Sequence, residues 1–255
     1  MSTFRPVHMG LLTAGALVLT VGCRPNRDTG AVTSKTGEQT STVPSTKTEE
    51  KRDLALVRVV NALPGGAPIS ITAGDSAAFS SVKYKTTTPY REIADNMFNF
   101  KLRAGTADTS TKPLAENREN LNGGGHYTIV AMPDEGGADK ANLRVLDDEL
   151  KPVAAEHARV RFINAVPGGK DVDVVLKGVP EPLFDGVNFK SEAGWKEVAP
   201  AKGTLEVRPD GKETVLASVR DVSLEGGQSY TFVLTGRGGK YDVIKVTDEV
   251  APAPK

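Results

Sequence analysis

The chain has 255 residues, of which 38% are hydrophobic and 25% are charged. Lys and Arg together number 32 and Asp and Glu together number 32, so the formal net charge is zero. The basic excess that is typical of nucleic-acid-binding domains is missing, and we expect no nucleic-acid partner.

Residues 1–22 are predicted to be a lipoprotein signal peptide. Arg5 precedes an uncharged stretch of 13 residues, 9–21, which is too short to cross a bilayer because a helical span needs about 20 residues. The stretch ends at Cys23, the single cysteine of the chain. The sequence TVGC resembles a bacterial lipobox, which implies that Cys23 is acylated and anchors the protein to a membrane. The alternative is an ordinary signal peptide with an incidental cysteine.

The segment 23–53 is predicted to be a disordered tether. It is rich in Ser, Thr and charged residues, and it has too few apolar residues to offset the entropy of ordering. As a flexible coil it would reach roughly 30 Å. Anchor and tether together predict an extracytoplasmic protein of the cell envelope, in the outer membrane facing the periplasm or on the cell surface. They do not identify the leaflet.

The rest of the chain contains an internal duplication. Residues 57–66 (VRVVNALPGG) recur as 160–169 (VRFINAVPGG), and residues 121–128 (LNGGGHYT) recur as 224–231 (LEGGQSYT). The two matches have the same spacing along the chain, which indicates a tandem repeat of one domain. We place the two copies at residues 54–152 and 156–249, followed by a disordered tail at 250–255.

Period-two patterns predict strands in both copies. Leu205 and Val207, for example, alternate with charged neighbours, which is typical of a strand with one buried and one wet face. Strands are predicted near 55–61, 68–73, 79–84, 88–93, 98–103, 113–119, 126–132 and 141–147, and near 158–164, 171–176, 181–187, 193–198, 203–208, 213–222, 229–236 and 240–247. This number of short strands favours an all-β fold of two tandem immunoglobulin-like antiparallel β-sandwich domains.

A pattern Leu-x-x-Gly-x-x-Tyr precedes Tyr127 and Tyr230 in the two copies. It resembles the tyrosine corner of β-sandwiches, in which the ring packs in the core and the hydroxyl bonds back to the backbone. We therefore expect both tyrosines to be structural.

The repeated Val-Arg-x-x-Asn-Ala-x-Pro motif, with VDV at 172–174 and PAKG at 200–203, resembles the bacterial domain of unknown function 4397. The resemblance covers residues 54–249. It implies tandem domains of exported proteins and lipoproteins, without an established activity. Where the usual pattern has His-Ala-Ser-Pro, this chain has Asn61 and Asn164, so a role of that histidine is not carried over.

Few residues are available for catalysis. Outside the signal peptide the histidines are His126 and His157, and neither lies in a nucleophile motif such as Gly-x-Ser-x-Gly. We expect no catalytic residue and no cofactor. The rival hypothesis is a hydrolase with a site between the two domains, lined by one of these histidines.

Acidic and aromatic residues offer two further candidates. Asp171, Asp173 and a flexible acidic loop at 134–139 lack the spacing of an EF-hand, so we expect solvated charges and no metal site. Tyr90 and Trp195 occupy matching positions in the two copies and are candidate ligand-facing aromatics. Exposed rings at these positions would suit a surface carbohydrate-binding module.

The sequence thus favours a non-catalytic binding or structural role at the envelope, with an envelope protein or a polysaccharide as partner. The copies share their framework but differ at 83–85 against 188–190 and at 134–139 against 237–239. This difference predicts that the two domains fold independently and present one composite surface.

Overall fold

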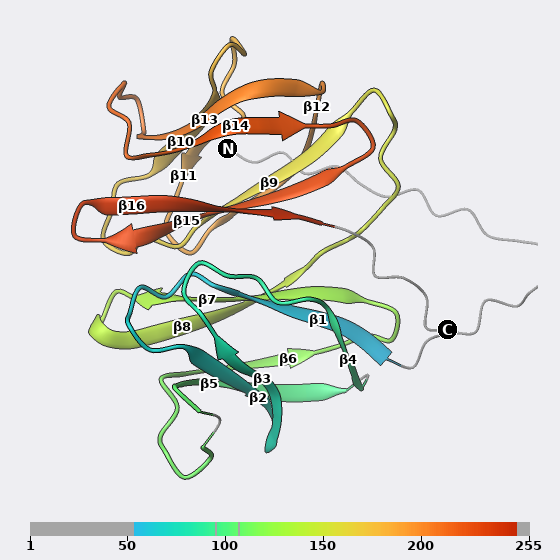
Figure 1. Cartoon of the computed structure of the whole chain (residues 1–255), viewed down its shortest axis with the longest axis vertical. Coiled ribbons are helices and arrows are strands. Elements are labelled where there is room, and N and C mark those ends of the chain that lie inside the picture. Colours follow the sequence, from blue (N-terminus) through green and yellow to red (C-terminus); the bar gives the residue numbers. More distant parts are fainter. Residues whose placement is uncertain (1–53, 95, 107, 249–255) are drawn as a thin grey trace, which may run out of the picture. The chain divides into compact units, whose positions relative to one another are not determined.

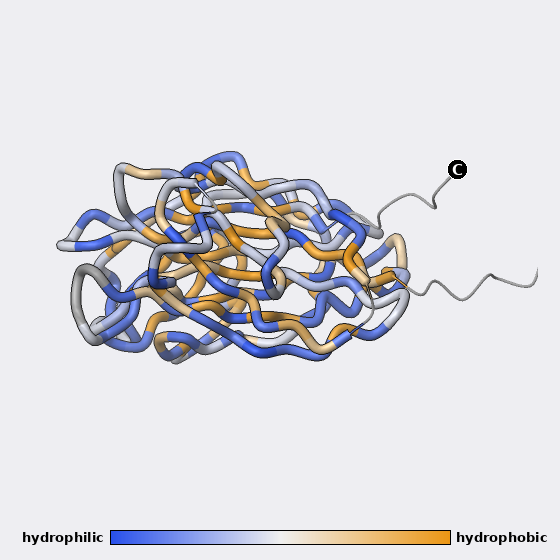
Figure 2. The backbone as a smooth tube through the Cα atoms, turned by 90° about the horizontal axis from the view of Figure 1, so that it is seen from below, coloured by the Kyte–Doolittle hydropathy of each residue, from blue (hydrophilic) through white to orange (hydrophobic). Residues whose placement is uncertain are grey.

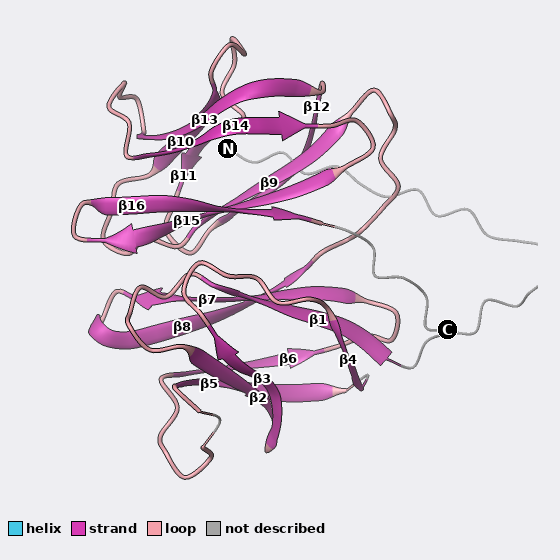
Figure 3. Ribbon diagram, viewed as in Figure 1, coloured by secondary structure: helices cyan, strands magenta, loops and turns pink. Residues whose placement is uncertain are grey.

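The computed structural model describes residues 54–94, 96–106 and 108–248. The predicted signal peptide, the lipidation site Cys23, the tether and the tail 250–255 lie outside these residues. In the described part of the chain every regular element is a strand (Figure 3). No helix there is long and apolar enough to cross a membrane.

Repeat 1 is a sandwich of two four-stranded sheets (Figure 1). One sheet has the order β4-β1-β7-β8, and the other has the order β3-β2-β5-β6. The strands are β1 (Leu54–Asn61), β2 (Ile69–Ala73), β3 (Ser76–Val82), β4 (Arg91–Ala94), β5 (Met97–Ala104), β6 (Ala115–Asn120), β7 (His126–Asp134) and β8 (Gly137–Asp147).

Repeat 2 has the same topology, with sheets ordered β12-β9-β15-β16 and β11-β10-β13-β14. Its strands are β9 (Ala158–Asn164), β10 (Val172–Leu176), β11 (Phe184–Val187), β12 (Glu192–Val198), β13 (Ala201–Pro209), β14 (Ala217–Leu224), β15 (Ser229–Arg237) and β16 (Lys240–Thr247). Each predicted strand is present, and the all-β fold of two tandem β-sandwich domains is confirmed.

Two details differ from the sequence-based expectations. β1 pairs with β7, and β9 with β15, in parallel rather than antiparallel register. Parallel neighbours need a long crossover, and in each repeat the intervening strands supply it. The predicted acidic loop at 134–139 is mostly strand, because β7 ends at Asp134 and β8 begins at Gly137. A tight turn joins these two strands.

Each sandwich buries an apolar core between its sheets. On β10, Val172, Val174 and Leu176 are buried and belong to this core, while Asp173 between them is partly exposed, as the alternation predicts. Figure 2 shows hydrophobic stretches running through the interior and hydrophilic ones at outer turns. The core of repeat 1 includes Val57, Val59, Ile71, Phe79, Phe100, Leu102 and Ile129, and that of repeat 2 includes Val160, Phe162, Val174, Leu205, Val207 and Phe232.

The central strands β1 and β9 are buried on both faces. Val57 and Val59 face the core of repeat 1, whereas Val60 joins a third apolar cluster that also contains Ile163 of repeat 2. The other members of this cluster are Ala62, Val130, Met132, Leu146, Ala165, Val233, Ile244 and Val246. The expectation of one wet face per strand is therefore wrong for these strands, because the other repeat covers that face.

Candidate functional site

Two buried arginines occupy matching positions in the two repeats. Arg58 on β1 donates from Nε to Thr128 Oγ1 at 2.9 Å, and Arg161 on β9 donates from Nε to Thr231 Oγ1 at 2.7 Å. Both threonines are fully buried. The Val-Arg motif thus places a guanidinium on the sheet face that the other repeat covers.

The carboxylate partners of these arginines cross between the repeats. Asp248 of repeat 2 pairs with Arg58, and Asp148 of repeat 1 pairs with Arg161. Each aspartate also accepts from the threonine of its own repeat: Thr128 Oγ1 donates to Asp148 at 2.7 Å and Thr231 Oγ1 donates to Asp248 at 2.8 Å. Removal of one partner from a buried pair leaves an uncompensated charge. The crossed pairs therefore hold the two repeats in one arrangement.

Burial changes the ionisation of this cluster. The loss of water raises the pKa of Asp248, although the guanidinium groups of Arg58 and Arg161 act in the opposite direction. For Arg161 burial alone would lower the pKa, but the carboxylates of Asp148 and Asp248 outweigh it and the pKa is raised. Arg161 therefore stays charged inside the interface.

The candidate ligand-facing aromatics cover this cluster. The Arg58 guanidinium lies 4.7 Å from the centroid of the Tyr90 ring, and those of Arg159 and Arg161 each lie 4.5 Å from the Trp195 ring. Tyr90 Oη also donates to Asp148 at 2.6 Å. A sugar platform needs flat, exposed rings, and guanidinium groups stack on both of these. The arrangement argues against carbohydrate binding at Tyr90 and Trp195.

Tyr127 and Tyr230 have the geometry of tyrosine corners. Each ring is buried, and each hydroxyl accepts a hydrogen bond from a backbone N–H five residues earlier, from Asn122 at 3.0 Å and from Glu225 at 3.1 Å. We expected a hydrogen bond between each hydroxyl and the backbone. The structure shows this bond, with the backbone N–H as donor and the hydroxyl as acceptor. Both side chains hold a turn in place.

The asparagines of the repeated motif also have structural contacts, which the sequence reasoning missed. Asn61 donates to the carbonyl of Val82 at 2.9 Å and accepts from the N–H of Leu63 at 3.0 Å. Asn164 repeats this pattern with Val187 and Val166, both at 3.1 Å. The signal in the sequence is an asparagine placed shortly before a Pro-Gly-Gly turn in both copies. Such an amide, once buried, needs hydrogen-bond partners, and the backbone around the turn supplies them.

The histidines do not indicate catalysis. His126 begins β7, and its ring packs edge-on against Tyr90, with 5.4 Å between the centroids. His157 precedes β9, and its backbone N–H donates to the carbonyl of Ala154 at 3.0 Å. His126 therefore packs against an aromatic ring, and the backbone of His157 closes a turn.

An acidic group lies on repeat 2. Carboxylate oxygens of Asp173, Asp185 and Asp210 lie within 4.8 Å of one another, while Asp171 is outside the group. Burial alone would raise the pKa of Asp173. Hydrogen bonds from the N–H groups of Gly186 (2.9 Å) and Gly211 (3.0 Å) stabilise its carboxylate more strongly, so the pKa of Asp173 is lowered overall. The carboxylate of Asp173 in turn raises the pKa of the neighbouring Asp185.

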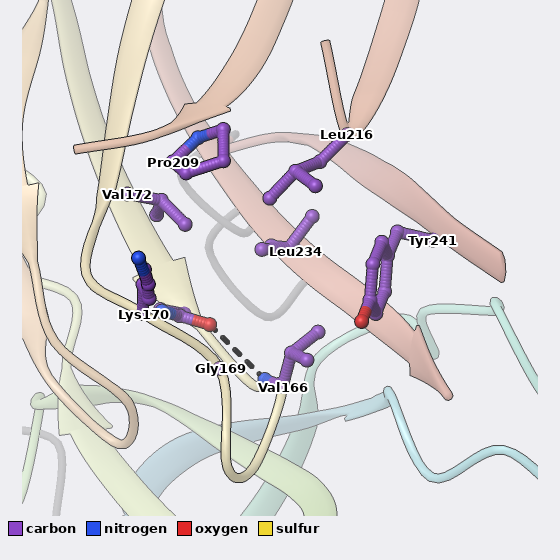
Figure 4. Close-up of a pocket in the computed structure, with 9 residues that line it drawn as sticks. Val166, Gly169, Lys170, Val172, Pro209, Leu216, Leu234 and Tyr241 are labelled. Atoms are coloured by element: carbon purple, nitrogen blue, oxygen red, sulfur yellow. Dashed lines mark hydrogen bonds between the residues drawn. The ribbon is translucent and has the colours of Figure 1, made fainter. Parts of the chain in front are cut away.

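A small apolar pocket opens at one end of repeat 2, beside the Pro-Gly-Gly turn. Its volume is about 180 Å³. Figure 4 shows the side chains of Val166, Val172, Leu216 and Leu234 converging on it, with Tyr241 at one side. The remaining lining residues are Asn164, Gly169, Lys170 and Pro209.

A second cavity of about 250 Å³ adjoins the pocket through Tyr241, which lines both. It is built from both repeats: Pro64, Tyr84 and Lys85 come from repeat 1, and Gly236, Arg237, Lys240, Tyr241 and Asp242 come from repeat 2. Lys85 pairs with Asp242, and the hydrogen bond to this carboxylate raises the pKa of the lysine. We call pocket and cavity together the Tyr241 groove. The sequence had singled out segments 83–85 and 237–239 as divergent, and the structure brings residues of both to this groove.

Comparisons with known proteins identify the family. No curated protein matches the chain by sequence. Among solved structures, the C-terminal domain of AlgF from P. aeruginosa is similar, with 22% identity, a TM-score of 0.29, and coverage of 36% of this chain and 99% of that one. The family described as Domain of unknown function (DUF4397) matches residues 55–175 and 158–255. The chain therefore belongs to the DUF4397 family, whose domain it carries in two tandem copies.

Proposed function

We propose that the protein is a lipid-anchored envelope protein that binds a partner, without catalysis, in the Tyr241 groove. The observation that carries the binding role is the composition of the groove, which is lined by both repeats at segments where they differ. The apolar stretch that ends at Cys23 supports the anchor, and the Ser- and Thr-rich segment 23–53 supports a tether that gives the groove reach from the membrane.

The interface between the repeats keeps the groove in a preformed shape. The crossed pairs of Arg58 and Arg161, together with the apolar cluster around Val60 and Ile163, bury the faces that adjoin it. A preformed site loses less entropy when a partner binds. The composite groove therefore suits recognition by two domains that act as one unit.

The chemistry of the groove favours binding over turnover. A general acid or base works best with a pKa near the operating pH. Asp242 raises the pKa of Lys85 away from neutrality, so this lysine of the groove is a poor general base. The pocket itself is lined mainly by aliphatic side chains around Leu234. These properties are typical of a recognition site.

The anchor is tested by Cys23→Ala. We expect this variant to leave the membrane fraction, because it lacks the cysteine that would be acylated on its sulfur and then on its new amino group. Fractionation of cells followed by a high-salt wash measures the shift. Retention of the variant in the washed membrane pellet would refute the lipoprotein hypothesis.

The groove is tested by cross-linking on intact cells. Tyr241→Ala should reduce the yield of cross-linked partner at least fivefold, because Tyr241 lines both halves of the groove. Arg220→Ala is the matched control, since Arg220 is exposed on β14 and lies outside the groove lining. Equal yields from the two variants would contradict a partner site at the groove. Substrate turnover that disappears in His126→Ala would contradict the non-catalytic role.

A further inference from the structure

We propose that the Tyr241 groove binds an acidic segment of a partner protein and accepts one apolar side chain in the pocket beside Leu234. This inference rests on the proposed function, because it names the chemistry of the partner at the same site.

The pocket has the size of a side-chain anchor. Small-molecule sites usually have volumes of about 300–1,000 Å³, whereas this pocket has about 180 Å³. Its walls are Val166, Val172, Leu216 and Leu234, so they offer an apolar group many contacts and few hydrogen bonds. Single apolar or aromatic side chains that fill such pockets dominate the affinity of many protein interfaces.

The lining of the groove carries an excess of positive charge. Lys170 lies at the pocket, and Lys85, Arg237 and Lys240 line the adjoining cavity, against the single carboxylate of Asp242. Complementary charge across an interface guides association and selects the partner. Acidic residues that flank an apolar anchor match this pattern.

The acidic group of repeat 2 does not cancel this charge inside the groove. Asp173 alternates along β10 with Val172 and Val174, which face the core, and Val172 lines the pocket. The carboxylate of Asp173 therefore lies on the opposite face of the strand. A partner in the groove therefore faces the positively charged lining and not the carboxylate of Asp173.

An anionic lipid fits the same site less well. Its headgroup would match the lysines, but the apolar pocket is small and the adjoining cavity is lined by Lys85, Arg237 and Asp242. Most methylenes of an acyl chain would then lie against charged groups and gain little from burial. A peptide places one apolar group in the pocket and polar backbone along the cavity.

The test uses blocked pentapeptides and the full chain, kept soluble by Cys23→Ala. The first probe has Leu between two pairs of Glu, the second has Ala in place of Leu, and the third has Lys in place of Glu. Amide shifts of Leu234 and Tyr241 in NMR titrations give the dissociation constants. We expect the second probe to bind at least fivefold more weakly than the first, and the third at least tenfold.

Matched variants locate the binding. Gly169→Leu should abolish binding of the first probe, because a Cβ at Gly169 would lie at ordinary contact distances of 3.8–3.9 Å from Val166 and the side chain would occupy the pocket. Gly66→Leu, the same position in repeat 1, has open space and should leave binding unchanged. Lys170→Glu combined with Lys240→Glu should weaken binding at least tenfold, a result that does not depend on the folding of the Gly169 variant.

Three outcomes would overturn the inference. They are equal binding of the basic and acidic probes, binding that Gly66→Leu and Gly169→Leu affect alike, and binding to phosphatidylglycerol vesicles without binding of the acidic probe. If the acidic probe fails while Gly169→Leu still prevents partner capture on cells, the inference fails and the proposed function stands. If Gly169→Leu leaves capture intact, the proposed function at this groove fails.

Discussion

The two repeats have one framework but differ at the end that carries the groove. In repeat 2, Leu234 on β15 and Tyr241 on β16 line the pocket. Strand register places Ala131 and Ala141 at the corresponding positions of repeat 1, and both pack against its core. Small residues thus stand in one copy where the other has large ones. The difference teaches that the two copies share the sandwich and the interface, while the pocket beside Leu234 is lined by residues of repeat 2 alone.

The interface shows a weaker asymmetry of the same kind. Arg58 and Arg161 make equivalent bonds to threonine and to the aspartate of the other repeat. Arg161 additionally contacts Glu192 at 3.3 Å, and its side chain is fully buried, whereas that of Arg58 is 4% exposed. In the described part of the chain, Arg161 therefore has one more carboxylate partner than Arg58 and is more deeply buried.

Separation of the repeats should have the largest effect. The sequence led us to expect that residues 54–152 and 156–255 each fold alone. The structure changes this expectation, because separation exposes the apolar cluster around Val60 and Ile163 to water and breaks the crossed pairs. Urea unfolding should show each isolated repeat to be less stable than the intact chain by more than about 5 kcal/mol, or unfolded. Isolated repeats that match the stability of the intact chain would contradict the interface.

Single substitutions in the cluster should measure its asymmetry. We expect Arg161→Ala to destabilise the protein by about 3–5 kcal/mol, because it leaves the buried Asp148 without its guanidinium. Arg58→Ala should cost less, since the Arg58 side chain is slightly more exposed and has, among the described residues, no counterpart of the contact between Arg161 and Glu192. The free energies of unfolding from urea titrations make the comparison. A larger loss for Arg58→Ala would reverse the asymmetry.

The tyrosine corners should respond alike in the two repeats. Tyr127→Phe removes the acceptor of the Asn122 N–H, and Tyr230→Phe removes that of the Glu225 N–H. Each change should cost about 1–3 kcal/mol, because a partly buried backbone donor loses its partner. Thermal unfolding of both variants checks this. If one variant melts like the unchanged protein, the equivalence of the two turns fails.

The sequence could predict the features that depend on local patterns. Alternation and glycine-rich turns indicated the strands, and the spacing before Tyr127 indicated the corner. Arg58 could not be placed in this way, because on an alternating strand it resembles a residue on a wet face. Its partner Asp248 follows 190 residues later, and the pair forms only when two sheet faces meet. The groove depends on the same docking: the sequence marked segments 83–85 and 237–239 as divergent, but it could not show that they lie together.

Ion pairs at the rim of the interface should have the smallest effect. Lys85 and Lys190 occupy matching positions and both have positive φ, and each pairs across the interface, with Asp242 and with Asp134 respectively. Exposed pairs contribute little and are screened by salt. The two pairs are informative because their stabilisation should be lost at different pH: that of Asp134 with Lys190 in acid and that of Lys85 with Asp242 in alkali.

The acid side tests the pair of Asp134. Bonds from the Gly136 N–H and from Lys190 lower the pKa of Asp134 below its ordinary value of 3.8. Because the folded state then binds fewer protons, the stabilisation is present above 3.8 and is lost as pH falls through the lowered pKa. Asp134→Asn should reduce the acid-side slope of urea midpoints at low salt, while Asp173, whose pKa is also lowered, keeps its own share of that slope. A slope equal to that of the unchanged protein would exclude the pair of Asp134 as a contributor.

The alkaline side tests the other pair. The bond to Asp242 raises the pKa of Lys85 above 10.5, so its stabilisation is complete below that value and is lost as pH rises through the raised pKa. Lys85→Met should flatten the alkaline limb of the same profile and leave the acid limb unchanged, whereas Asp134→Asn should do the reverse. If both variants changed the same limb, the two rim pairs would not act independently, and the pseudo-symmetry of the interface would not extend to its edge.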